Sequence, residues 1–409
     1  TTISNKMHKL NSFLSKPIAD ILKGSAGEDA GNTVPESAVV SAIALYKACT
    51  QQVPAYQNFL AAHEYNSDDV QSFRDFQEKV PLIEKKNYLF KYPLPERCIG
   101  GSIFPGSIDF IHVSSGSTGI PTFWARSIGG EIAVAARFEQ ILVDALGADK
   151  KKTLAVVAFP LGSWVGGIFT TFCLRYVCMK GHPITIVTPG DKVPEILRCV
   201  QALSPMYEQT CILGYPPFVK GTIDAGRAQG VPWERFDLSL VLAGEVFSEE
   251  WRQLVAERAG IARPLRNIVS IYGTADAGVI GNETPLSAVI RAWLATRPLV
   301  ARELFGSDRL PTLLQYDPHV RLLEVTGQGT LVLTSLDAAP SSRAQQLHPH
   351  AHGRHCQVVI ASIGKLNSLN RSWKSNEGTY QSVSEFFRNL CSIRSSKLNM
   401  KKHIIRRFF

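Results

Sequence analysis

The segment Ile108-Asp-Phe-Ile-His-Val-Ser-Ser-Gly-Ser-Thr-Gly-Ile-Pro-Thr122 joins an apolar run to a loop of glycine and hydroxyl residues, and it constrains the fold strongly. Residues 108–113 predict a strand, because β-branched and aromatic side chains favour extended backbone. In the loop, glycines allow several backbone N–H groups to converge, and hydroxyls add further donors. The loop therefore predicts a phosphate cradle, with an unliganded polar turn as the alternative. It lacks the Gly-Lys-Ser/Thr ending of a Walker loop, which argues against a P-loop hydrolase.

Short apolar runs alternate with helical patterns on the C-terminal side of this segment. The predicted strands span 108–113, 153–159, 183–187, 210–214, 238–243, 267–272 and 330–336, and the helical patterns span 129–146, 166–180, 192–203, 216–229 and 248–259. Residues 36–62, before the segment, also predict helix. Repeated strand–helix–strand order predicts an α/β domain with a largely parallel sheet and helices on its faces.

The local signals agree well around the helix predicted at 248–259. Ser248 is an N-cap residue, Glu249 complements the positive end of the helix dipole, and Gly260 ends the helix. 

Charge is distributed unevenly along the 409 residues, whose net charge is +9. Residues 341–409 contain 12 Lys and Arg against Glu377 and Glu385, so this tail alone carries +10. The body is nearly neutral, and nucleic acid is therefore not an expected partner. The eight cysteines are scattered, which predicts a reducing compartment and a cytoplasmic location. The sequence has no run of apolar residues long enough for a membrane span.

Two further segments place polar residues at the ends of predicted buried strands. They are Leu242-Ala-Gly-Glu245 and Ile271-Tyr-Gly-Thr-Ala-Asp-Ala-Gly278. Open α/β folds bind ligands at the carboxyl edge of the sheet, where such residues meet. Tyr272 offers a ring for a nucleobase, Thr274 a hydroxyl for a phosphate, and Asp276 an oxygen ligand for Mg²⁺.

Together the three segments resemble the phosphate loop, adenine-side loop and aromatic-Gly-Thr-x-acid motif of the AMP-forming adenylating superfamily. The most similar branch contains phenylacetate–CoA ligase and coenzyme F390 synthetase, and the resemblance covers about residues 38–340. Val53-Pro-Ala-Tyr56 and the stretch Val80 to Lys86 also resemble the helical lead-in of that branch. The resemblance implies the large domain of the adenylate-forming fold. It implies a lead-in at 38–107 and an AMP-binding α/β domain at 108–340, after a poorly defined segment at 1–37.

The resemblance also implies roles for individual residues. The phosphate loop would be Ser114, Ser115, Gly116, Ser117, Thr118 and Gly119, with Thr118 a main contact. Ala243, Gly244 and Glu245 would border the adenine, Tyr272 would stack on it, and Gly273 and Thr274 would reach the α-phosphate and the acyl group. Asp276 would hold Mg²⁺, and the carboxylate pocket would be walled by Phe159, Gly162, Trp164, Gly214 and Tyr215. Those apolar walls suit an aryl or medium-sized acyl acid.

The implied reaction uses ATP, Mg²⁺, coenzyme A and a small carboxylic acid. The acid attacks the α-phosphorus of ATP to form an acyl-adenylate, and the thiol of coenzyme A then displaces AMP. An amine or cofactor hydroxyl as acceptor, and a non-catalytic nucleotide-binding remnant, are the alternatives. The sequence also leaves a homodimer open.

The chain departs from this branch at three places. Ile120 stands where the phosphate loop usually has lysine, and Asp276 where the magnesium motif usually has glutamate. Beyond Pro340 we recognise neither the acid that holds the ribose nor the small C-terminal domain with its lysine. We therefore expect residues 341–409 to be a disordered or frame-shifted tail. If the tail is genuine, we expect weak or no ligase activity from this chain, with ATP binding retained.

Overall fold

The computed structural model describes residues 2–18, 34–103, 108–114, 121–275, 277–305, 309–325, 331–336 and 358–362. Its centre is an eight-stranded sheet in the order β12-β9-β8-β7-β6-β5-β3-β4. The strands are β3 (Thr153–Ala158), β4 (Ile184–Val187), β5 (Gln209–Gly214), β6 (Leu238–Ala243), β7 (Ile268–Thr274), β8 (Gly278–Asn282), β9 (Thr312–Tyr316) and β12 (Val358–Ser362). Neighbouring strands from β4 to β7 are parallel, as are β9 and β12, and β8 is antiparallel to β7 and β9. The predicted α/β class with a largely parallel sheet is confirmed.

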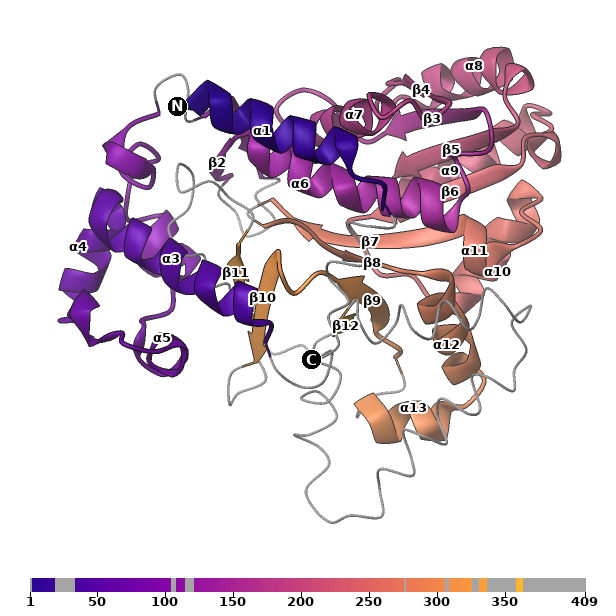
Figure 1. The fold of residues 1–409 in the computed structure, drawn as a ribbon. Helices are drawn as coiled ribbons and strands as arrows, with labels where there is room; N and C mark the ends of the chain where they lie inside the picture. The colour runs from indigo at the N-terminus through magenta and orange to yellow at the C-terminus, as the bar shows by residue number, and fades with distance from the viewer. Residues whose placement is uncertain are drawn as a thin grey trace.

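Helices cover both faces of this sheet (Figure 1). One face packs against α1 (Thr2–Ser15), α6 (Ile128–Glu139) and α7 (Val165–Cys178), and α1 lies against α6. The other face packs against α8 (Val193–Leu203), α9 (Pro216–Ala228) and α10 (Glu249–Ala259). Alternate residues of β3 point to opposite faces, so Ala155 and Val157 join the first core while Leu154 and Val156 join the second. Burial on both faces explains why these strands are continuous apolar runs.

Local signals of helix ends hold in the structure. Ser248 Oγ accepts a hydrogen bond from the backbone N–H of Trp251 at 3.2 Å, and Gly260 adopts a left-handed conformation with φ of 63°. The helix predicted at 36–62 is divided into α3 (Glu36–Gln52) and α4 (Pro54–Ala62), because Pro54 begins the second helix.

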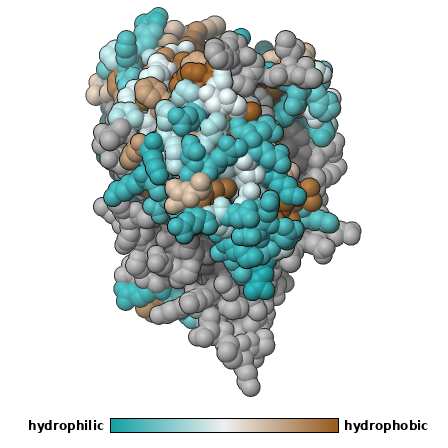
Figure 2. Space-filling view, turned by 90° about the vertical axis from the view of Figure 1, so that its left-hand side faces the viewer, coloured by the Kyte–Doolittle hydropathy of each residue, from teal (hydrophilic) through white to brown (hydrophobic). Residues whose placement is uncertain are grey.

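The lead-in has a hydrophobic core of its own. It is built from α3, α4 and α5 (Phe73–Lys79), and Trp124 and Leu322 from elsewhere in the chain pack into it. The outer surface on this side of the molecule is largely hydrophilic, with apolar side chains in scattered patches (Figure 2). The lead-in is thus attached to the α/β domain through buried apolar contacts. 

The strand predicted at 108–113 forms, but it does not join the large sheet. It is β1 (Phe110–Val113), which pairs antiparallel with β2 (Phe123–Arg126) in a separate hairpin. The strand at 330–336 is likewise β11 (Leu331–Ser335), paired with β10 (Arg321–Val325) in a second small sheet. Each run finds a neighbouring strand close in sequence, and such a partner forms an antiparallel pair through a short connection.

The other described α-helices lie before β7 and between β8 and β9. They are α11 (Pro264–Asn267), which precedes β7, and α12 (Pro285–Ala295) and α13 (Pro298–Phe305), which precede β9. No helix within the described ranges is long and apolar enough to cross a bilayer.

Within residues 341–409 the structure describes 358–362 alone, and these form β12 against β9. The tail's other residues lie outside the described ranges. The shifted-frame hypothesis and the domain boundaries stay predictions.

Candidate functional site

The carboxyl edge of the parallel strands contains a topological switch point. β3 lies between β4 and β5 in the sheet. The chain leaving β3 passes through α7 to β4 on one side, whereas the chain leaving β5 passes through α9 to β6 on the opposite side. Ala158 and Gly214 are register partners at the ends of these two strands. Ligands of open α/β sheets bind outside the carboxyl ends at such a point. The segments that begin at Phe159 and Tyr215 therefore leave the sheet at the expected site.

The other predicted segments leave from the next strands along the same edge. Gly214 of β5 pairs with Leu242 of β6, and Ala243 of β6 pairs with Ile271 of β7. The segments beginning at Gly244 and Tyr272 are thus the next two neighbours. The structure brings the predicted adenine-side and pocket residues to one edge of the sheet, as the sequence indicated.

The stem of the Ser/Thr/Gly loop is tied to this edge by backbone hydrogen bonds. Ser114 N donates to Thr122 O at 3.0 Å, and Thr122 N donates to Ser114 Oγ at 2.9 Å, which closes the stem. Val113 N donates to Ser163 O at 2.9 Å, and Val113 also forms a bridge with Trp164. The stem therefore lies beside the segment after β3. Ser115, Gly116, Ser117, Thr118 and Gly119 themselves lie outside the described residues.

Tyr215 connects the predicted pocket wall with the predicted adenine-side segment. Its hydroxyl donates a hydrogen bond to the Glu245 carboxylate, and this bond, followed by burial, raises the pKa of Tyr215. Gly244 has a φ of 99°, and a Cβ there would lie 3.1 Å from Cδ2 of the Tyr215 ring. Glycine is therefore required for both the backbone conformation and the close approach of the ring.

The pocket residues differ in exposure. Phe159 packs against the first core, and a Cβ on Gly166 would touch its ring at 3.5 Å. Gly162 is exposed with a φ of 87°, and Trp164 and Tyr215 are each 39% exposed. Two aromatic rings thus remain accessible at the switch point.

The turn between β7 and β8 carries the third motif. A bulge falls between Tyr272 and Gly273, and a Cβ on Gly273 would lie 2.7 Å from Gly278 O, so the close approach of the strands needs glycine. Tyr272 is half-buried and Gly273 is exposed. Thr274 Oγ1 accepts a hydrogen bond from Ala277 N at 3.2 Å. Asp276 lies outside the described residues, so its place as a metal ligand is untested.

Two buried arginines, which sequence reasoning missed, hold the ends of this turn. Arg126 of β2 donates to Ala275 O, and Arg321 Nη2 of β10 donates to Ala277 O at 2.9 Å. Arg126 is the last residue of β2, the strand that follows the Ser/Thr/Gly loop, so the hairpin joins the stem of that loop to the β7–β8 turn. The sequence offered one sign of the role of Arg126, namely a single charged residue directly after the apolar run Phe123-Trp-Ala125.

Arg126 also interacts electrostatically with two buried titratable side chains, His112 and Glu131. Burial, with a further contribution from the Arg126 charge, lowers the pKa of His112 to about 4. Burial raises the pKa of Glu131 to about 7, against the opposing effect of a hydrogen bond from Tyr176. His112 is therefore neutral at physiological pH. Among the described residues, no cluster of three His, Cys, Asp or Glu side chains suited to a metal ion is found.

The sequence matches no protein-family model and no curated protein. Solved structures of 2-hydroxyisobutyryl-CoA ligase are similar to it. An open conformation in complex with 2-HIB-AMP and CoA has a TM-score of 0.57 at 15% identity, over 76% of this chain and 67% of that chain. The thioesterification state, also with 2-HIB-AMP and CoA, has a TM-score of 0.58 at 15% identity, over 76% of this chain and 62% of that chain. The postadenylation state with 2-HIB-AMP has a TM-score of 0.56 at 15% identity, over 76% of this chain and 61% of that chain.

These similarities define the fold. The chain has the α/β arrangement of the N-terminal domain of the adenylate-forming fold, as predicted. It spans less than two thirds of the length of the two neighbours in the thioesterification and postadenylation states.

Proposed function

We propose that this chain binds ATP at the carboxyl edge of β5, β6 and β7, activates a carboxylic acid as an acyl-adenylate and transfers the acyl group to coenzyme A. The observation that carries the proposal is that four separate segments lie along one carboxyl edge of the sheet, beginning at the switch point between β3 and β5. Those segments are the stem at Ser114 and Thr122, the Tyr215–Glu245 contact, the Tyr272–Thr274 strand end and the segment after β3. The similarity of fold to 2-hydroxyisobutyryl-CoA ligase agrees with it.

Each segment has a proposed role in holding ATP. Tyr272 stacks on the adenine, bordered by Ala243, Gly244 and Glu245, and residues 114–119 hold the β- and γ-phosphates through Thr118. Gly273 is exposed, so its backbone is accessible to the α-phosphate and to the carboxylate beside Thr274. A carboxylate oxygen is the ligand that Mg²⁺ prefers, and Asp276 supplies one. Mg²⁺, when bound, neutralises phosphate charge.

The two chemical steps balance without a protein nucleophile. A carboxylate oxygen attacks the α-phosphorus, the bond to the bridging oxygen breaks, and pyrophosphate leaves. The thiolate sulfur of coenzyme A then attacks the acyl carbon, and AMP leaves with the oxygen that came from the acid. The chain's residues position the reactants and stabilise charge, which is how most phosphoryl and acyl transfer sites work.

The acid is proposed to be aryl or medium-chain acyl, in keeping with the phenylacetate–CoA ligase branch. Trp164 and Tyr215 offer exposed rings, and no described atom would meet a Cβ on Gly162. Gly214, in contrast, is buried, and a Cβ there would lie 2.6 Å from Val219 Cγ2, so it packs the strand end and leaves no space. Apolar walls of this kind bind a hydrophobic acid tail better than a charged one.

The test is formation of AMP from ATP by the purified full-length chain. Phenylacetate, benzoate, hexanoate and 2-hydroxyisobutyrate are supplied in turn with Mg²⁺, with and without coenzyme A. We expect AMP release that needs an acid and increases with coenzyme A, and its loss in Thr274→Val. Release that ignores coenzyme A points to another acceptor. ATP binding with no acid-dependent AMP overturns the ligase proposal and supports a nucleotide-binding remnant.

A further inference from the structure

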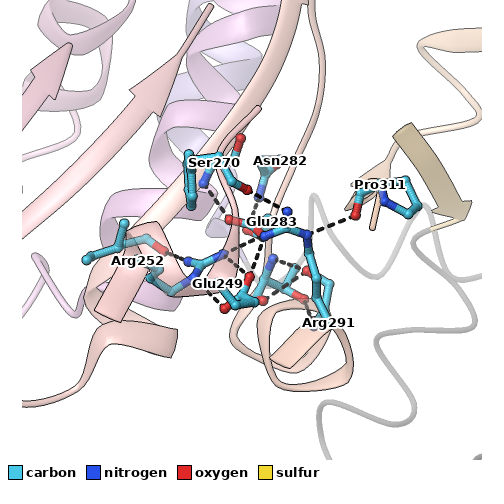
Figure 3. Close-up of polar contacts among 11 residues, drawn as sticks. Glu249, Arg252, Ser270, Asn282, Glu283, Arg291 and Pro311 are labelled. Carbon is cyan, nitrogen blue, oxygen red and sulfur yellow. Dashed lines mark hydrogen bonds and ion pairs between the residues drawn. The ribbon is translucent and has the colours of Figure 1, made fainter. Parts of the chain in front are cut away.

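Four charged side chains form a buried network behind the predicted adenine-side segment (Figure 3). Arg252 of α10 is 0% exposed, and it contacts Glu249 Oε2 through Nε at 2.9 Å and Glu283 Oε1 through Nη2 at 2.8 Å. Arg291 of α12 is 2% exposed and contacts Glu249 Oε1 through Nη1. Two guanidinium and two carboxylate groups therefore balance in charge without reaching solvent.

The same side chains are bound to backbone groups of β7 and of the residue directly before β9. Arg252 donates to Ile268 O of β7, and Glu283 Oε2 accepts from Ser270 N at 2.8 Å. Arg291 Nε donates to Pro311 O at 2.9 Å, directly before β9. The network thus fixes α10 and α12 against the sheet, as the dashed contacts of Figure 3 show.

Arg291 also reaches the segment that leads from β6 to α10. Its Nη2 donates to Phe247 O at 2.5 Å, two residues beyond Glu245. The Phe247 ring is buried, with its centroid 4.9 Å from the Arg252 guanidinium carbon and 6.0 Å from that of Arg291. Both the carbonyl and the ring of Phe247 are therefore held by the network.

Stability alone does not account for this arrangement. Apolar side chains of similar volume often stabilise a core as well as a buried ion network or better, because they avoid the desolvation of charge. Directional contacts to a backbone carbonyl, in contrast, fix a position that apolar packing leaves adjustable. A directional contact matters most at Phe247 O, because the residues before Phe247 have no regular secondary structure that would fix their position.

We propose that Arg291 is a positioning residue for residues 244–247. It holds the far end of this segment through Phe247 O, while Tyr215 holds the near end through Glu245. Together they set where Gly244 and Glu245 stand at the carboxyl edge. The assignment rests on the proposed function, in which this segment borders the adenine of ATP.

The test compares Arg291→Lys and Arg291→Met with Arg137→Lys. Arg137 is another buried arginine, 6% exposed against 2% for Arg291. Its guanidinium group contacts Gln140 and, at 3.4 Å, Asp317, and neither residue belongs to the segment 244–247. The first readout is amide hydrogen exchange of peptides covering 243–248 in the ligand-free protein. We expect exchange there to become at least about tenfold faster in both Arg291 variants, as in a local opening, and to stay unchanged in Arg137→Lys.

The second readout is ATP affinity, with KM for ATP and kcat measured separately. Arg291→Lys should weaken ATP binding by about tenfold, as expected when one charge-assisted hydrogen bond is lost, with kcat changed less than KM. Equal exchange at 243–248 in all three variants, or equal loss of ATP affinity in Arg137→Lys, overturns the proposal. If Arg291→Met does not fold, Arg291→Lys decides.

The two hypotheses fail in different ways. Failure of the wild-type chain to bind ATP refutes the proposed function. The exchange measurement uses no ligand, so it still decides whether Arg291 fixes the segment.

Discussion

Replacing Gly273 with alanine should weaken the fold at the centre of the proposed site. The new Cβ would lie 2.7 Å from Gly278 O and 3.2 Å from both Gly278 C and Val279 Cα. All three are backbone atoms of β8, so no side chain can rotate away, and the two strands must separate. Overpacking of this kind typically costs about 1–3 kcal/mol of folding free energy.

The same substitution at Gly221 is the matched control. Gly221 lies inside α9, it is exposed, and no atom of the described residues lies within 4 Å of the position that its Cβ would take. Alanine there should stabilise the fold by about 0.5–1 kcal/mol, because it restricts the unfolded chain and favours helix. The two variants should therefore shift the free energy of unfolding in opposite directions.

Guanidinium unfolding, followed by tryptophan fluorescence, measures both shifts. ATP titration of the same samples should show weaker binding for Gly273→Ala and unchanged binding for Gly221→Ala. A Gly273→Ala protein as stable as wild type, or stabilised like Gly221→Ala, would refute the close approach of β7 and β8.

Two predictions concern the groups around the site. The pKa of His112 falls from 6.5 to about 4 on folding, so its contribution to stability is present above pH 6.5 and is lost as pH decreases toward 4. The pKa of Glu131 rises from 4.5 to about 7, so its contribution is present below pH 4.5 and is lost as pH increases toward 7. The two effects offset each other between pH 4.5 and 6.5. Glu131→Gln should therefore lose stability relative to wild type as pH falls through that window, by up to about 1.4 kcal/mol per pH unit. A difference between the two proteins that does not depend on pH would contradict the shift of Glu131. Tyr215→Phe removes the hydrogen bond to Glu245 at an exposed site, so it should cost less than about 1 kcal/mol of stability yet weaken ATP binding about threefold; unchanged ATP affinity in a titration would show that the contact does not position the segment.

The large sheet could be predicted because its strands are buried on both faces. Every residue of β3 and β5 is buried, and both strands contain an apolar run, Leu154–Ala158 in β3 and Cys211–Gly214 in β5, that is visible in the sequence. The helix ends at Ser248 and Gly260 could also be predicted, because capping depends on residues that are close together in the sequence.

Other elements depend on partners that the sequence does not reveal. β8 contains Gly278 and Gly281, which indicate a turn when read locally. In the fold, a Cβ on Gly281 would lie 2.6 Å from Gln315 O, so glycine allows β8 to fit between β7 and β9. The run at 110–113 is similar in character to the parallel strands, and only its pairing with β2 separates it from them.

The sequence predicted that the motifs lie at the carboxyl edge of the sheet, and their roles in binding ATP stay predictions. The side chains that hold these segments in place were not predicted. The motifs around Tyr215, Glu245 and Tyr272 meet at one edge, as the order of strands implied. Glu249 was expected to complement a helix dipole, but it is buried and paired with Arg252 and Arg291. Its partner on α12 lies 42 positions away in sequence, and no local pattern links charges over that distance.

The central claim is tested most directly by oxygen transfer from the acid to AMP. Phenylacetate labelled with ¹⁸O in its carboxylate is incubated with the full-length chain, ATP, Mg²⁺ and coenzyme A, and AMP is analysed by mass spectrometry. Attack of the carboxylate on the α-phosphorus predicts one ¹⁸O in each AMP, because the thiol displaces AMP together with that oxygen. AMP without the label, or ADP in its place, would contradict formation of an acyl-adenylate.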